Sequence, residues 1–143
     1  MKTKLLFVCS SLFLVVTLLA EQRPGPNPDP LGGNLFSPEL IMRNQRAIGL
    51  ESVQRDAIRA EIQKAQQKFT ELQWEMQDAA EVMISLVSQD RVDEQQALEQ
   101  LDKVLAIERK VKRAQIQLMV RLKNQLTPEQ QKQLRELRQK AER

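Results

Sequence analysis

The stretch "IRAEIQKAQQKFTELQWEMQDAAEVMISL", residues 58–86, decides the fold. Its apolar side chains recur at alternating steps of four and three residues, which is the heptad spacing of a helix that packs against one partner helix. The predicted stripe consists of Ile58, Ile62, Ala65, Phe69, Leu72, Met76, Ala79 or Ala80, Met83 and Leu86. A long helix with one apolar stripe predicts a helical hairpin.

The second arm of this hairpin follows residues 88–93, "SQDRVD", which interrupt the apolar pattern. Asp93 with Gln96 three residues later resembles a capping box, so a new helix is expected to begin there and to run to about Gln125. Its expected stripe passes through Ala97 or Leu98, Leu101, Val104 or Leu105, Glu108, Val111, Gln115, Leu118 and Leu122.

Glu108 and Gln115 would be buried polar residues in that stripe. Glu108 either curls its carboxylate to the edge of the stripe to pair with an Arg, or helps to form a functional or register-setting polar site.

Two shorter helices flank the predicted hairpin. Ser37 is a candidate N-cap with Pro38 behind it, so a short helix is expected from Pro38 to about Ala47, with Gly49 after its end. The segment "LESVQ", residues 50–54, then opens the long helix. The expected fold is all-α: a long antiparallel helical hairpin with short N- and C-terminal helices.

The last helix follows the segment "LTPEQ", residues 126–130. Thr127 is the expected N-cap, Pro128 fits the first helical position, and Gln130 can reach back to the cap as in a capping box. The helix should run from Pro128 to about Glu142. On this reasoning Thr127→Ala costs about 1 kcal/mol, and Gln130→Ala costs less.

The N-terminus predicts export. Residues 1–20 contain two lysines, an uncharged apolar run and a final small residue, which is the layout of a secretory signal peptide cleaved after Ala20. An uncleaved membrane anchor is the alternative. Cys9 lies in this segment, so the mature chain has no cysteine. Residues 21–37, rich in Pro and Gly, are expected to be a flexible linker, and residues 38–143 the helical domain.

Charge is unevenly distributed along the chain. Residues 21–102 hold 15 acidic and 8 basic residues, whereas residues 103–143 hold 4 acidic and 12 basic ones. One interpretation is an acidic first arm lying against a basic second arm of the hairpin. The other is a basic face offered to clients or to an acidic sensor domain.

The composition argues against several functions. The chain has no His and no Tyr, and it contains no phosphate-binding loop or nucleophile elbow, so neither an enzyme nor a cofactor is expected. Nucleic-acid binding is disfavoured because the basic half has no aromatic residues. No metal site is expected without imidazole or mature thiolate. The methionines Met42, Met76, Met83 and Met119 are interpreted as core filler, with Cu(I) binding as the alternative.

Other apolar residues predict a second interface. A long hairpin buries only one stripe per helix, so a homodimer is the economical arrangement. The second arm carries apolar residues off its expected stripe, at Ile107, Ile116, Met119 and Val120. Trp74 lies two residues after Leu72, so it should point away from the hairpin partner. It is either a dimer anchor or a contact for clients, together with Met42, Ile116 and Val120.

The motifs carry a family likeness. Leu126, Thr127 and Gln130 match the Leu-Thr-x-x-Gln motif of the Spy/CpxP family, and Leu50 and Gln54 match its first copy, with Glu51 in place of Thr. With the helix order, the chain from Ser37 to Arg143 resembles these proteins, which are related to heavy-metal resistance proteins of the ZraP and CnrX kind.

The resemblance implies a periplasmic protein that forms a cradle-shaped, intertwined homodimer. It implies an ATP-independent chaperone or envelope-stress protein that binds unfolded or misfolded envelope proteins. The alternative is a sensor or adaptor that regulates a membrane partner with weak metal binding or none, because the metal branch of the family uses His and this chain has none.

Overall fold

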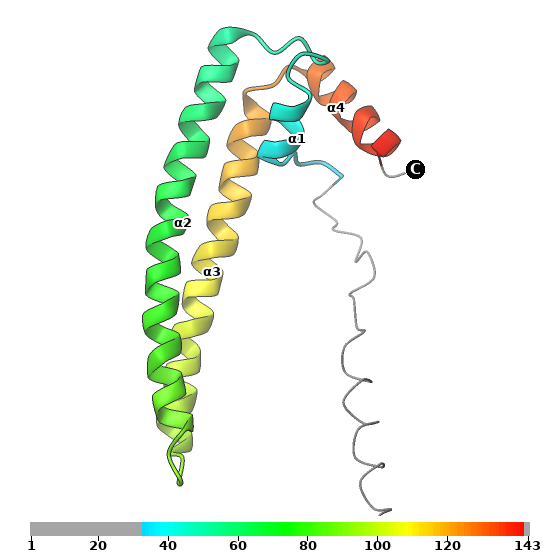
Figure 1. Cartoon of the computed structure of the whole chain (residues 1–143). Coiled ribbons are helices and arrows are strands. Elements are labelled where there is room, and N and C mark those ends of the chain that lie inside the picture. The colour runs from blue at the N-terminus through cyan, green and yellow to red at the C-terminus, as the bar shows by residue number, and fades with distance from the viewer. Residues whose placement is uncertain (1–32, 142–143) are drawn as a thin grey trace, which may run out of the picture. The chain divides into compact units, whose positions relative to one another are not determined.

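A computed structural model of the chain describes residues 33–141, and these residues are 80% helical with no strand among them. Residues 1–20 and most of the expected linker lie outside the described residues. The four helices are α1 (Pro38–Arg43), α2 (Ser52–Val87), α3 (Glu94–Asn124) and α4 (Pro128–Ala141). Helices α2 and α3 pack side by side as a long antiparallel hairpin, with α1 and α4 at its open end (Figure 1). The all-α fold is therefore confirmed.

The predicted stripe of α2 is confirmed. Each of its positions is buried or half-buried, with Ile58 and Leu72 almost fully covered. The capping prediction for α3 also holds, because Asp93 is the N-cap and its side chain accepts from the Gln96 backbone N–H at 3.1 Å. Heptad spacing and caps thus locate both arms of the hairpin.

The stripe that α3 turns to α2 matches the predicted one at Ala97, Val104, Val111, Leu118 and Leu122, and differs from it at three positions. Leu101, Glu108 and Gln115 are exposed, and Gln100, Ile107 and Ala114 take their places in the stripe. Leu98 and Leu105, the alternatives to Ala97 and Val104, are also exposed. Ile107, expected off the stripe, lies within it. Helix α3 carries two apolar stripes, and the one with smaller side chains faces the large residues of α2. The larger leucines remain on the outer side.

Helix α1 is shorter than predicted and ends at Arg43, not at Ala47. The Asn44 side chain donates to the Leu40 carbonyl oxygen at 2.8 Å, and this side-chain bond stands in for continued helix. Residues 44–49 form turns, and Gly49 closes them with a φ of 61°, a left-handed conformation that suits glycine. The turns let Ile48 reach the core.

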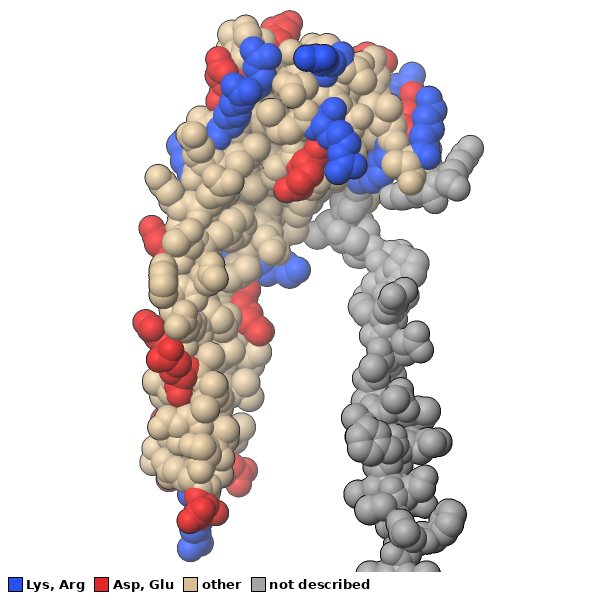
Figure 2. Space-filling view, in the orientation of Figure 1, with Lys and Arg blue, Asp and Glu red and all other residues tan. Residues whose placement is uncertain are grey.

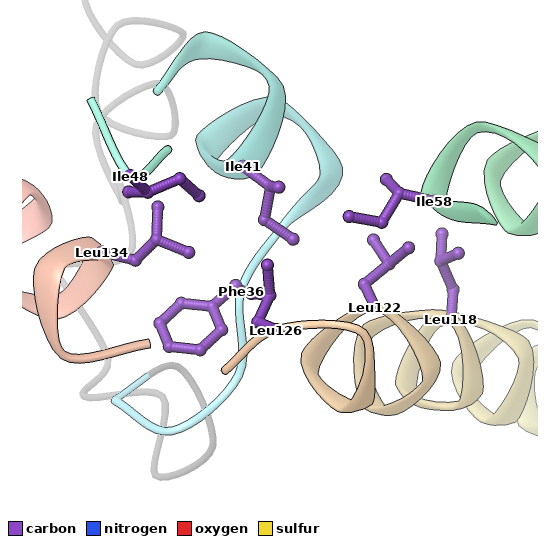
Figure 3. Close-up of a cluster of buried hydrophobic side chains, with 8 residues drawn as sticks. All are labelled: Phe36, Ile41, Ile48, Ile58, Leu118, Leu122, Leu126 and Leu134. Atoms are coloured by element: carbon purple, nitrogen blue, oxygen red, sulfur yellow. The ribbon is translucent and has the colours of Figure 1, made fainter. Parts of the chain in front are cut away.

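The main core lies at the open end of the hairpin. Figure 3 shows its side chains pointing toward one another from all four helices and from the segments between them. The cluster consists of Phe36, Ile41, Ile48, Ile58, Leu118, Leu122, Leu126 and Leu134. A smaller cluster of Leu72, Ala79 and Ile107 continues along the hairpin. The short helices are therefore held by apolar packing against α2 and α3.

Beyond these clusters the hairpin has no core. The last buried positions are Ala79 and Gln100, and the Gln100 amide donates to the Ala79 carbonyl oxygen at 2.8 Å. No residue from 80 to 99 is buried. Large apolar side chains are exposed there instead, at Val82, Ile84, Val87, Val92 and Leu98.

Charge separates along the hairpin as well as between its arms. The hairpin tip, residues 71–106, holds 9 acidic and 2 basic residues, and the hairpin base, residues 52–70 and 107–124, holds 3 acidic and 10 basic ones. Figure 2 shows one face with this division, red toward the tip and blue toward the open end. The interpretation of an acidic first arm against a basic second arm is supported as well. Helix α2 holds 6 acidic and 4 basic residues, α3 holds 4 acidic and 7 basic ones, and ion pairs join Glu75 to Lys110 and Glu61 to Arg121.

Candidate functional site

The two family-like motifs meet through their glutamines. Gln54, in the first turn of α2, and Gln130, in the first turn of α4, exchange two hydrogen bonds of 3.0 Å, each amide donating to the other's side-chain oxygen. Each oxygen also accepts a backbone N–H of its own motif, from Glu51 at 3.1 Å and from Thr127 at 2.9 Å. The glutamines therefore cap their own helices and join them.

The remaining bonds of the pair repeat the same pattern. Gln54 donates to the carbonyl oxygen of Gln125 at 2.7 Å, and Gln130 donates to that of Gly49 at 3.4 Å. Each acceptor directly precedes the leucine of the opposite motif. Gln130 is buried, with 8% of its surface exposed, and every donor and acceptor of the two amides has a protein partner. We call this pair the glutamine clasp; it fixes the starts of α2 and α4 against each other.

The capping box expected at Thr127 is present, because the Thr127 hydroxyl accepts the Gln130 N–H at 3.3 Å while Gln130 returns the bond. In the first motif Glu51 occupies the N-cap position. The side-chain oxygen of Gln54 still accepts the backbone N–H of Glu51, so the clasp forms with Glu51 in place of the Thr of the motif.

The motif leucines belong to the core below the clasp. Leu126 is buried, and Leu50 is half-buried and packs against the main cluster. Gln131 donates to the carbonyl oxygens of Lys123 and Leu126, at the end of α3. Sequence reasoning missed Gln131 and the cross-pairing of the glutamines, since neither has a local signal.

Arg138 of α4 holds the chain that leads into α1. Its guanidinium donates to the carbonyl oxygens of Gly33 at 2.7 Å and Leu35 at 3.2 Å. It also lies 6.0 Å from the centre of the Phe36 ring, within reach of a cation–π interaction. Sequence reasoning did not single out this arginine.

The candidate contact residues lie on α1, α2 and α3. Trp74 is 60% exposed on α2, as expected for a side chain that points away from α3. Val120 is exposed on α3, with Ile116 and Met119 half-buried on the same helix. Met42 is half-buried against the main core cluster. A shared surface of Met42 with Trp74 stays a prediction.

The predicted buried polar residues are also misplaced. Glu108 and Gln115 are exposed, because the hairpin stripe of α3 passes one residue before each of them. The buried polar side chain of the stripe is Gln100, which bonds to the α2 backbone.

Two ion pairs join the arms of the hairpin among the described residues. Lys110 donates to Glu75 at 2.7 Å and Arg121 to Glu61 at 2.9 Å. Hydrogen bonds from Arg121 and Lys64 lower the pKa of Glu61, and the bond from Lys110 lowers the pKa of Glu75. These carboxylates stay ionised, which suits pairing and not proton transfer.

Within residues 33–141 the acids do not gather into a metal site, since no group of three or more potential His, Cys, Asp or Glu ligands occurs there. None of the helices in this range is long and apolar enough to cross a membrane. The described part of the chain offers hydrogen bonds, charge and exposed apolar surface.

Comparison with known proteins gives one match. The family model described as heavy-metal resistance matches residues 6–133, which span both arms of the hairpin and both motifs. No curated protein and no solved structure matches the chain. The family is not an enzyme family, and its members are typically periplasmic. The chain belongs to the heavy-metal resistance family, which includes the Spy/CpxP-like proteins with Leu-Thr-x-x-Gln motifs.

Proposed function

We propose that the protein is a periplasmic, ATP-independent chaperone that transiently binds unfolded or misfolded proteins of the cell envelope. Family membership supports the location, because members are typically periplasmic. The exposed apolar side chains of the hairpin support the activity, since unfolded clients present apolar segments to which such side chains bind.

The observation that carries the proposal is the exposure of Trp74. An indole that is 60% exposed on the outer face of α2 contributes nothing to the hairpin core. Its neighbours on that face are polar and half of them are acidic: Gln67, Thr70, Glu71, Gln77, Asp78 and Glu81, all exposed. Glutamine amides both donate and accept hydrogen bonds, so they suit the unpaired backbone of an unfolded chain.

Such a surface binds loosely. One aromatic ring among exposed polar side chains supplies little buried area, and each side chain that is immobilised loses rotamer entropy on binding. Loose binding lets a client leave without nucleotide hydrolysis.

Aggregation of a model client tests the proposal. Trp74→Ala should weaken suppression of aggregation several-fold, whereas Val53→Ala, which trims an apolar side chain that is 76% exposed elsewhere on α2, should not. Because Trp74 is the only tryptophan, its fluorescence should shift when an unfolded client is added. Full suppression by Trp74→Ala without a shift in the parent protein would remove Trp74 from client binding.

The second candidate is a sensor or adaptor for a membrane partner. The heavy-metal description of the family favours it. The chain has no histidine, so we expect Zn, Ni and Co to bind no tighter than to a generic acidic surface. A submicromolar site with defined stoichiometry in calorimetry would favour the metal-sensing reading over the chaperone.

A further inference from the structure

Trp74 lies in an acidic part of the α2 surface. Residues three or four apart on a helix are neighbours, with about 5–6 Å between their Cβ atoms. Glu71 precedes Trp74 by three residues and Asp78 follows it by four, so a carboxylate flanks the indole on either side along the helix. Glu81 follows three residues beyond Asp78. The indole and the three carboxylates are all exposed, and we call this surface the tryptophan face.

Two of these carboxylates are not neutralised within the described part of the chain. Glu71 pairs with Lys68 at 2.9 Å. Asp78 and Glu81 form no ion pair with any residue from 33 to 141, and Glu81 accepts only from the uncharged Gln77 amide, at 3.2 Å. Basic residues are scarce in this region, because the hairpin tip holds 9 acidic and 2 basic residues. The tryptophan face therefore carries net negative charge.

An exposed indole beside carboxylates suits a cationic ligand. The face of an aromatic ring attracts cations, and the indole of Trp does so most strongly. A neighbouring carboxylate adds a charge-assisted hydrogen bond to the same cation. Arginine satisfies both groups best, because its planar guanidinium can stack on the ring while its N–H groups bond to a carboxylate. The ammonium group of lysine is more strongly hydrated and cannot stack in this way.

We propose that the tryptophan face selects arginine-containing segments of its clients, with the guanidinium stacked on Trp74 and bonded to Asp78 or Glu81. The proposal rests on the chaperone function, since it names the class of segment that this surface binds. The negative charge of the hairpin tip attracts the same segments from a distance. Binding stays loose, because a cation–π contact and an ion pair each contribute little at an exposed site.

Synthetic peptides test this selectivity. The peptides share one apolar sequence without Trp or Tyr and carry Arg, Lys, Gln or Glu at the same positions. Binding to the full chain is followed by the fluorescence of Trp74, its only tryptophan. The affinity should fall in the order Arg, Lys, Gln, Glu, with about tenfold between the Arg and Glu peptides. Equal affinity for the Arg and Glu peptides would overturn the proposal.

Removal of the two carboxylates tests where the selectivity arises. Asp78→Asn/Glu81→Gln preserves the size of both side chains and should weaken binding of the Arg peptide about tenfold, with no change for the Gln peptide. Glu99→Gln/Asp102→Asn is the matched control, because it removes two exposed charges from α3 in the same tip. At physiological salt, which screens distant charges, it should leave the affinity within about twofold. Equal weakening by both double variants would assign the selectivity to the charge of the whole tip and overturn the proposal.

Aggregation assays separate this proposal from the chaperone function. If the chain suppresses aggregation but binds the Arg and Glu peptides equally, the chaperone function stands and the selectivity for arginine fails. If it binds the Arg peptide at Trp74 but suppresses no aggregation, the arginine-binding face stands and the chaperone function fails. An affinity for the Arg peptide that falls as the concentration of the chain rises would place a second copy on this face and overturn the proposal.

Discussion

The two ends of the hairpin differ in how they are held. At the open end, eight buried side chains form one cluster and the glutamine clasp joins α2 to α4. At the other end, no residue from 80 to 99 is buried, and Val82, Ile84 and Val87 are exposed. Stabilising contacts are thus concentrated where the chain segments converge. The tip exposes apolar and acidic side chains.

The largest expected difference between the two ends concerns core packing. Leu122→Ala should lower the free energy of unfolding by about 3 kcal/mol, because the side chain is fully buried in the main cluster and its loss leaves a cavity. Ile84→Ala, at a tip position that is 63% exposed, should cost less than about 0.5 kcal/mol. Urea denaturation measures both. Equal losses would show that the tip is packed as tightly as the open end.

The next effect concerns the glutamine clasp. Gln130→Ala should cost about 2 kcal/mol, because it leaves the Thr127 N–H and one side of the Gln54 amide without their partners in a part-buried site. This exceeds the loss predicted from capping alone. The double variant Gln54→Ala/Gln130→Ala should cost less than the sum of the singles, since the two residues satisfy each other. Additive losses would mean that the glutamines act separately.

Loss of the cap without loss of the clasp should have a smaller effect. Thr127→Ala removes only the hydroxyl that accepts the Gln130 N–H, so about 1 kcal/mol is expected. Thr127→Ser keeps that hydroxyl and is the matched control. If Thr127→Ala destabilised the chain more than Gln130→Ala, capping and not the clasp would dominate this site.

The smallest effect concerns the ion pair between Glu61 and Arg121. The hydrogen bonds from Arg121 and Lys64 lower the pKa of Glu61, so the pair stabilises the fold above the ordinary carboxyl value of 4.5 and loses its contribution as the pH falls through the lowered value. At neutral pH, Glu61→Gln should cost no more than about 1 kcal/mol.

Thermal melts of the parent chain and of Glu61→Gln at several pH values measure the difference in their stability. It should close in acid. A difference that persists after Glu61 is protonated would assign the effect to packing and not to charge.

The sequence predicts α2 better than α3 for a physical reason. Helix α2 has one apolar stripe, so its periodicity identifies the buried face without ambiguity. Helix α3 has two, and in its first half the outer stripe carries Leu98, Leu101 and Leu105, whereas the stripe facing α2 carries Ala97, Gln100 and Val104. Hydrophobicity alone favours these leucines for the hairpin, but in the structure they are exposed and Gln100 bonds to the α2 backbone instead. Which stripe of α3 packs against α2 therefore depends on the side chains of both helices.

The glutamine clasp was likewise only partly predictable from the sequence. The local half of each motif could be predicted, because a cap and its glutamine lie three residues apart. The bonds between Gln54 and Gln130 join positions 76 residues apart, and no local pattern reports them. Likewise, the end of α1 depends on a side-chain bond from Asn44 that competes with continued helix.

Backbone hydrogen exchange tests the contrast between the two ends most directly. The amides of residues 55–72 in α2, which pack on the core clusters, should exchange far more slowly than those of residues 80–87 at the tip end of the same helix. Both segments have complete helical hydrogen bonding, so the comparison isolates tertiary packing from secondary structure. Equal protection along α2, or slower exchange at residues 80–87 than at residues 55–72, would contradict the concentration of stabilising contacts at the open end.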